Sequence, residues 1–170
     1  MPQYPPSPGR TGQDSPFGAI MKRAVLIVVA VLAAVYLAAL LVPYEPDERR
    51  PGTRLGGPLA AEQDTDWSFR SPGRMQISVE TATWYGVPHS VTTTSWIVDG
   101  DLYVPCNACA TKRWPKNVAR NPDVRLKVGI EIYERRAVRI EDDAERRRLF
   151  AALTDRPVPP GRWVFRMEAR

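Results

Sequence analysis

The chain has 170 residues, and its 24 lysines and arginines against 19 acidic residues give a formal net charge of +5. The positive surplus lies late in the sequence, because Ala110–Arg170 holds 16 basic and 9 acidic residues. Such a surplus suits a phosphate-bearing ligand, anionic lipid headgroups or nucleic acid. A membrane segment without a recognisable nucleic-acid motif argues against the last, so no nucleic-acid partner is expected.

An uninterrupted apolar run near the N-terminus predicts a membrane helix. Ala24–Val42 comprises 19 residues without a charged side chain, which as a helix would span roughly 28 Å, close to the thickness of a bilayer core. A cleaved signal peptide is the alternative, but its apolar region usually has about 7–15 residues and ends at a small-x-small site. This run is longer and ends in the bulky Leu40–Tyr44. We therefore predict one transmembrane helix over residues 21–43 in a single-pass protein.

The flanks of this helix have the composition of unstructured chain. Residues 1–20 are rich in proline, glycine and serine and predict a disordered tail. Met21 stands directly before the apolar run, so the sequence is compatible with a start at Met1 or at Met21. Residues 44–60 predict a semi-extended tether, and residues 61–170 are enough for one domain and not two.

The charges beside the helix favour one orientation in the cell membrane. Lys22 and Arg23 abut the apolar run directly, whereas the arginines on the C-terminal side stand several residues away. Because basic residues close to the helix tend to remain in the cytoplasm, the domain is predicted to be extracytoplasmic.

The first half of the domain has the pattern of strands. Met75–Thr83 alternates apolar and polar residues with the period of a strand. Val91–Val98 is rich in β-branched and aromatic residues, which favours a second strand. Asp99-Gly100 suits a tight hairpin turn, and Leu102–Val104 then returns as the third strand.

The second half predicts two short helices and three more strands. Residues 111–122 fit a short helix with Pro115 in its first turn. Val124–Val128 and Ile130–Ile140 are predicted strands, and an amphipathic helix begins near Asp142. A last strand covers residues 163–168. The fold class is therefore mainly β (α+β), a small six-stranded antiparallel barrel with two short helices.

One ordered set of motifs resembles a known superfamily. It runs from Gly86-Val87-Pro88-His89 through the Asp99-Gly100 hairpin and Leu102-Tyr103-Val104 to Lys112–Val124, which contains Asn117-Val118-Ala119-Arg120-Asn121-Pro122. This order resembles the FMN-binding split-barrel superfamily of pyridoxamine 5'-phosphate oxidases and deazaflavin-dependent reductases. The resemblance covers roughly residues 75–140.

The resemblance implies a split β-barrel, a homodimer, an oxidoreductase activity and a flavin-type cofactor, FMN or deazaflavin. It points to hydroxyl groups on the second strand and to the start of the short helix as the phosphate site. Helix N–H groups, cations and hydroxyls are also what a phosphate needs on physical grounds, although Lys112 and Arg113 could instead be a solvated surface pair. The candidate cofactor-binding residues are Ser90, Thr92, Thr94, Thr111, Lys112, Arg113 and, facing the ligand, Trp114.

The two cysteines and the one histidine admit several interpretations. Cys106 and Cys109 could form a disulfide, a redox dithiol or part of a metal site with His89, or could pack as small apolar side chains. A single Cys-x-x-Cys is weak evidence for zinc, so no metal site is predicted. His89 is a candidate for proton transfer or a structural residue.

The sequence identifies no catalytic residue and no substrate. A non-catalytic ligand-binding or structural module of the same fold, and a Cys/His metal- or haem-binding protein, are the alternative functions. Trp84, Trp96, Trp114 and Trp163 are expected mostly in the core, because a small domain needs large apolar side chains, and among them Trp114 is the one expected to face a ligand.

Overall fold

The computed structural model describes residues 16–48, 50–63, 66–68, 70, 73–153, 159 and 161–170. The chain separates into two compact units, Met1–Leu37 and Ala38–Arg170.

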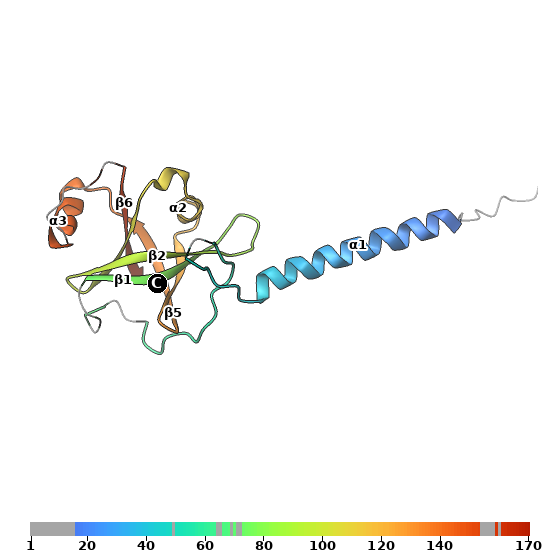
Figure 1. Cartoon of the computed structure of the whole chain (residues 1–170), viewed down its shortest axis with the longest axis horizontal. Helices are drawn as coiled ribbons and strands as arrows, with labels where there is room; N and C mark the ends of the chain where they lie inside the picture. Colours follow the sequence, from blue (N-terminus) through green and yellow to red (C-terminus); the bar gives the residue numbers. More distant parts are fainter. Residues whose placement is uncertain are drawn as a thin grey trace, which may run out of the picture. The chain divides into compact units, whose positions relative to one another are not determined.

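The N-terminal helix α1 covers Pro16–Leu41 (Figure 1). Within the span Gly18–Leu41 an 18-residue window has a mean hydropathy of 3.0, and none of that window is buried. The helix is therefore long and apolar enough to cross a membrane. It begins inside the segment expected to be a disordered tail, so residues 16–20 are helical, while residues 1–15 lie outside the described part of the chain.

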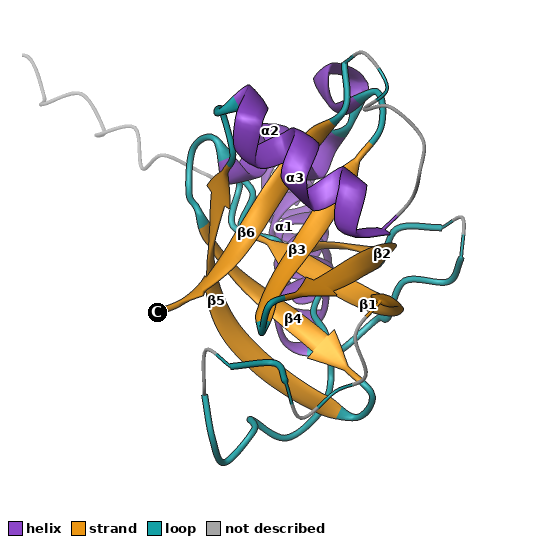
Figure 2. Cartoon of the chain, turned by 90° about the vertical axis from the view of Figure 1, so that its left-hand side faces the viewer, coloured by secondary structure: helices purple, strands orange, loops and turns teal. Residues whose placement is uncertain are grey.

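The second unit contains a closed six-stranded antiparallel barrel, as predicted (Figures 1 and 2). Around the barrel the strands follow the order β1-β2-β3-β6-β5-β4. Their bounds are β1 Gly73–Thr81, β2 His89–Val98, β3 Asp101–Cys106, β4 Asp123–Val128, β5 Glu131–Arg139 and β6 Trp163–Ala169. The expected short helices are α2, Arg113–Val118, and α3, Asp143–Leu153, and a 3-10 turn at Cys109–Thr111 precedes α2.

The tight turn between β2 and β3 forms where the sequence predicts it. Asp99 and Gly100 both have positive φ, 53° and 84°, the conformation of a two-residue hairpin turn that matches the twist of its strands. Val98 and Asp101 close the hairpin as a backbone pair.

The period of two along each strand separates the inside of the barrel from the outside. The inward side chains form the main core with contributions from all six strands, among them Ile77, Val79, Ile97, Val104, Leu126, Tyr133 and Phe165. A second apolar cluster lies on the outside, where α3 covers β2, β3 and β6 (Figure 2). In this cluster the ring of Trp96 meets the ring of Phe150 edge-on, with 5.0 Å between centroids.

The segment expected to be a tether packs against the barrel instead. We call this segment, residues 43–48 and 50–60, the strap. Gly52 and Ser90 exchange two backbone hydrogen bonds of 2.9 and 3.0 Å, and Ala60 donates to the carbonyl of Ile132 at 2.9 Å. Proline and glycine are typical of linkers, but the same extended backbone can also pair with a strand, and composition does not separate the two cases.

Side chains also hold the strap in place. Leu55 is 1% exposed, and its N–H donates to the carboxylate of Glu80 at 2.6 Å. Glu80 in turn pairs with Arg125 at 2.9 Å. At Gly52 a Cβ would collide with the carbonyl oxygen of Tyr44 and the hydroxyl of Ser90, so the close approach of the strap to β2 requires glycine.

A pair of leucine substitutions tests whether the strap is part of the folded domain. Leu55→Ala should lower the free energy of unfolding by about 2–5 kcal/mol, because it removes a buried side chain and leaves a cavity. Leu59→Ala is the matched control, since Leu59 lies on the same segment but is 59% exposed, and its effect should be below about 0.5 kcal/mol. Urea denaturation of the detergent-solubilised chain measures both. Equal, small effects would mean that the strap is a free tether.

Candidate functional site

The candidate site lies along β2 and the loop that enters α2, where two hollows adjoin. Lys112 and Thr93 line both of them. The first, which we call the strap hollow, has a volume of about 310 Å³, and the second, the basic groove, about 690 Å³. Both volumes are in the range of about 300–1,000 Å³ typical of small-molecule sites.

The strap hollow gathers four of the seven residues that the sequence singled out. Thr92, Lys112, Arg113 and Trp114 all line it. The remaining lining residues from the barrel are His89, Val91 and Thr93, and the strap adds Asp47, Glu48, Arg50 and Pro51. The strap is therefore one wall of the hollow, and sequence reasoning missed this contribution because the segment had been interpreted as a linker.

The other three predicted residues are elsewhere. Ser90 is 0% exposed beneath Gly52, so the strap separates its hydroxyl from any ligand in the hollow. Thr111 lines neither hollow, and its hydroxyl donates to the carbonyl of Ala108 at 2.8 Å. Thr94 is exposed and lines the basic groove.

Trp114 lies mainly in the barrel core. It is 3% exposed, and its ring packs against Phe165 with 4.9 Å between centroids. Trp114 therefore belongs to the main core and also lines the strap hollow.

The basic groove concentrates positive charge. Arg74, Lys112 and Arg162 line it, and among the described residues no acidic side chain does. Burial lowers the pKa of Arg162, and the nearby positive charge of Arg74 lowers it further. The two guanidinium groups therefore lie close enough to repel each other, and a bound anion would relieve this repulsion.

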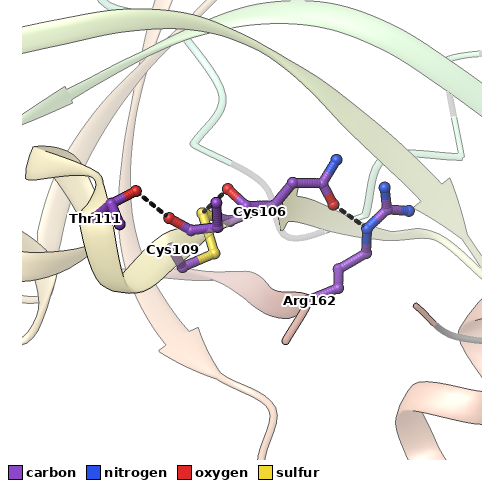
Figure 3. The surroundings of a disulfide bond; sticks show 6 residues. Cys106, Cys109, Thr111 and Arg162 are labelled. Atoms are coloured by element: carbon purple, nitrogen blue, oxygen red, sulfur yellow. Dashed lines mark hydrogen bonds between the residues drawn. A yellow bond between two sulfur atoms is a disulfide. The ribbon is translucent and has the colours of Figure 1, made fainter. Parts of the chain in front are cut away.

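Arg162 is held toward the groove by two contacts. Its Nε donates a hydrogen bond to Oδ1 of Asn107 (Figure 3), and its guanidinium lies over the ring of Phe150, 5.3 Å from the centroid. Such contacts restrict a long side chain that would otherwise lose rotamer freedom on binding a ligand.

Asn107 itself lies inside a small covalent loop. Cys106 and Cys109 form a disulfide with their Cα atoms 5.6 Å apart (Figure 3), and both residues are almost fully buried. The loop is tight enough for Ala108 to adopt a left-handed conformation, with φ 50°. The disulfide therefore fixes the backbone from which Asn107 reaches Arg162.

Sequence reasoning missed Arg74, Asn107 and Arg162 as site residues. Asn107 and Arg162 are 55 positions apart, and they meet because β3 pairs with β6 through Cys106 and Trp163. Arg74 reaches the groove because it lies opposite Trp96 in the pairing of β1 with β2. The surplus of basic residues in Ala110–Arg170 includes Arg162 but neither Arg74 nor Asn107.

His89 lines the strap hollow next to a cation. Burial lowers the pKa of its imidazole below 6.5, and the charge of Arg113 lowers it further. The side chain is therefore neutral near pH 7, the form that can accept a proton.

Comparisons with known proteins bear on the barrel. No family model matches the sequence, and no curated protein matches it. The similar solved structures include a conserved hypothetical protein from Mycobacterium tuberculosis, at 18% identity over 56% of this chain and 72% of that chain, with a TM-score of 0.45.

Two further structures have names that refer to the suspected superfamily. A protein suggested to be a pyridoxamine 5'-phosphate oxidase from Listeria innocua is 23% identical over 55% of this chain and 82% of its own, with a TM-score of 0.42. An F420 reductase is 16% identical over 56% of this chain and 86% of its own, with a TM-score of 0.39. Each of these structures is less than 25% identical to this chain, with a TM-score below 0.5.

The lowered pKa of His89 predicts a pH-dependent stability. Because the folded-state pKa lies below 6.5, the unfolded chain takes up the proton first as the pH falls. The contribution of His89 to the free energy of unfolding is constant above about pH 6.5. It is lost progressively as the pH falls below about 6.5, until the pH passes the folded-state pKa. Urea denaturation at about pH 7 and about pH 5 should therefore show a smaller loss of stability in His89→Gln than in the wild type. Identical losses in the two proteins would contradict the assigned shift.

Proposed function

We propose that the barrel binds a phosphate-bearing, flavin-type cofactor, FMN or a deazaflavin, with the phosphate in the basic groove. The observation that carries the proposal is the set of three cations, Arg74, Lys112 and Arg162, with no acid beside them in the described lining. Guanidinium and ammonium groups bind phosphate by charge-assisted hydrogen bonds, and the exposed hydroxyl of Thr94 adds a neutral donor.

Charge favours the basic groove over the strap hollow as the phosphate site. In the strap hollow the cations Arg50, Lys112 and Arg113 face two carboxylates, Asp47 and Glu48. A phosphate there would meet repulsion that the groove lacks. Lys112 can serve either hollow, so it keeps its predicted role, whereas Arg113 becomes a secondary contact.

The apolar lining of the groove comes from Trp96, Phe150 and Pro105. Trp96 and Phe150 are buried against each other, and the guanidinium of Arg162 lies over the Phe150 ring, so Pro105 is the more accessible apolar contact for a cofactor ring. A flavin-type group supplies hydride or electron transfer when bound. The residues of this chain would hold the phosphate, place the ring and exclude water, and the proposed activity is that of an oxidoreductase acting as a homodimer.

We propose that α1 anchors the barrel in the cell membrane, with the barrel outside the cytoplasm. The apolar span Gly18–Leu41 supports the anchor. The Cys106–Cys109 disulfide supports the location, because disulfides persist in oxidising compartments and are rare in the cytosol.

A non-catalytic ligand-binding module remains the second candidate, because the same groove could hold a phosphate-bearing ligand without redox chemistry. A Cys/His metal or haem site is less compatible with the structure, since both cysteines are consumed by the disulfide. In the described part of the chain no group of three or more His, Cys, Asp or Glu side chains could hold a metal ion. A yellow purified protein with a flavin or deazaflavin spectrum would favour the cofactor.

Charge reversals distinguish the two hollows as the phosphate site. Contacts between a cation and phosphate are worth roughly 1.5–3 kcal/mol each, so losing one weakens binding by about tenfold or more. Lys112→Glu and Arg162→Glu should therefore weaken the binding of FMN or a deazaflavin at least about tenfold in titrations of the detergent-solubilised chain.

Two further reversals serve as comparisons in the same titration. Arg113→Glu should have a smaller effect, because Arg113 lines only the strap hollow. Arg147→Glu, on the exposed face of α3, should have only a salt-screened effect. If all four reversals weaken binding equally, or if the wild type binds neither cofactor, the assigned site is wrong.

Extraction from membranes tests the anchor. The full chain should stay with membranes through an alkaline carbonate wash, because releasing the apolar span into water is unfavourable. A chain that begins at Pro43 should be soluble and keep the strap, whereas one that begins at Ala60 lacks Leu55 and should be less stable. Release of the full chain by the wash would contradict the anchor.

A further inference from the structure

Trp84 is exposed on the barrel, although the sequence predicted it to lie in the core. Trp84, in the loop of residues 82–88 between β1 and β2, is 79% exposed. In contrast, Trp67, Trp96 and Trp114 are each at most 3% exposed. An exposed tryptophan of this size is a candidate contact for a partner surface.

The loop is a formed turn that presents Trp84 outward. Gly86 has a φ of 87°, and its N–H donates to the carbonyl of Thr83 at 3.3 Å. The hydroxyl of Thr83 donates to the carbonyl of Val87 at 2.6 Å. Tyr85 meets Trp84 edge-on, with 5.3 Å between ring centroids, so two aromatic residues share the tip of the loop.

The strap brings this loop close to the point where the chain leaves the apolar helix. The N–H of Tyr44, two residues after Val42, donates to the carbonyl of Arg54 at 3.1 Å, and the N–H of Thr53 donates to the carbonyl of Tyr44 at 2.8 Å. The neighbouring Gly52 is paired with Ser90 near the start of β2. Figure 1 shows the β1–β2 loop at the same end of the barrel as this part of the strap.

Chain dimensions limit the separation. Two extended residues span at most about 7 Å. The pairing of Tyr44 with Thr53, one residue step to Gly52 and the pairing of Gly52 with Ser90 add about 13 Å. The start of β2 therefore lies within about 20 Å of Val42. The loop extends a further three residues from there, up to about 10 Å, so its tip lies within about 30 Å of Val42.

We propose that the loop of residues 82–88 is a second membrane contact, with Trp84 and Tyr85 inserted in the lipid–water interface. The proposal rests on the membrane anchoring proposed above and does not depend on the cofactor. Tryptophan and tyrosine favour this interface because their rings are apolar and carry a polar group. Tyr44, which is 58% exposed next to the exit of the chain, has the same chemistry.

Two contacts would fix the orientation of the barrel where one would leave it free to rotate.

Quenching of tryptophan fluorescence by brominated lipid tests the contact in the full chain reconstituted into vesicles. Flotation with the vesicles first establishes anchoring independently of the loop. Brominated lipid should quench a distinct part of the wild-type emission, and Trp84→Phe should remove most of that quenching. Trp163→Phe is the matched control, because Trp163 is partly buried and covered by Arg139, 3.8 Å from the ring centroid. It should leave the quenching unchanged.

The outcomes separate the possible failures. Absence of flotation overturns the anchor and this proposal together, and leaves cofactor binding to its own titration. Flotation without quenching, or equal quenching in the wild type and Trp84→Phe, overturns the lipid contact alone. A third outcome is that brominated lipid causes no quenching and that Trp84→Phe loses the self-association measured by crosslinking in vesicles. This outcome would assign the loop to contact with a second copy of the chain and would also overturn the lipid contact.

Discussion

The closure of the barrel through the pairing of β3 with β6 is the constraint on which the site depends. The Cys106–Trp163 pair places the disulfide loop beside the segment that carries Arg162. Without that register, Asn107 could not hold the guanidinium, and the basic groove would lose one of its three cations. The site is thus a consequence of strand pairing between distant parts of the chain.

Different segments cover different parts of the outer surface of the barrel. The helix α3 buries Trp96 and Tyr103 on one side, and the strap buries Leu55 on another. The hollows lie between these covers, where strand β2 is left partly open. Covering by the strap also explains why Ser90 is enclosed while Thr92 and Thr94, on the same alternating face, remain accessible to a ligand.

The cations of the groove are a cost to the unliganded fold. Burial lowers the pKa of Arg162, and the positive charge of Arg74 lowers it further. The hydrogen bond to Asn107 and the contact with Phe150 hold the Arg162 side chain in place despite this repulsion. Perturbed ionisable groups of this kind cluster at functional sites more often than on inert surfaces. Proteins commonly retain such unfavourable arrangements where a ligand compensates for them.

The sequence by itself determined the apolar helix, the six strands and the hairpin turn at Asp99-Gly100, because these depend on local period, length and backbone preference. It also identified Lys112 and Thr92 as candidate site residues, since both belong to motifs that are continuous in the chain. Only the tertiary structure decided that residues 43–48 and 50–60 form a strap, that Ser90 is buried and that Trp84 is exposed. Only the tertiary structure brought Arg74 and Arg162 together, because their proximity arises from strand pairing across long sequence separations, which leaves no trace in local composition.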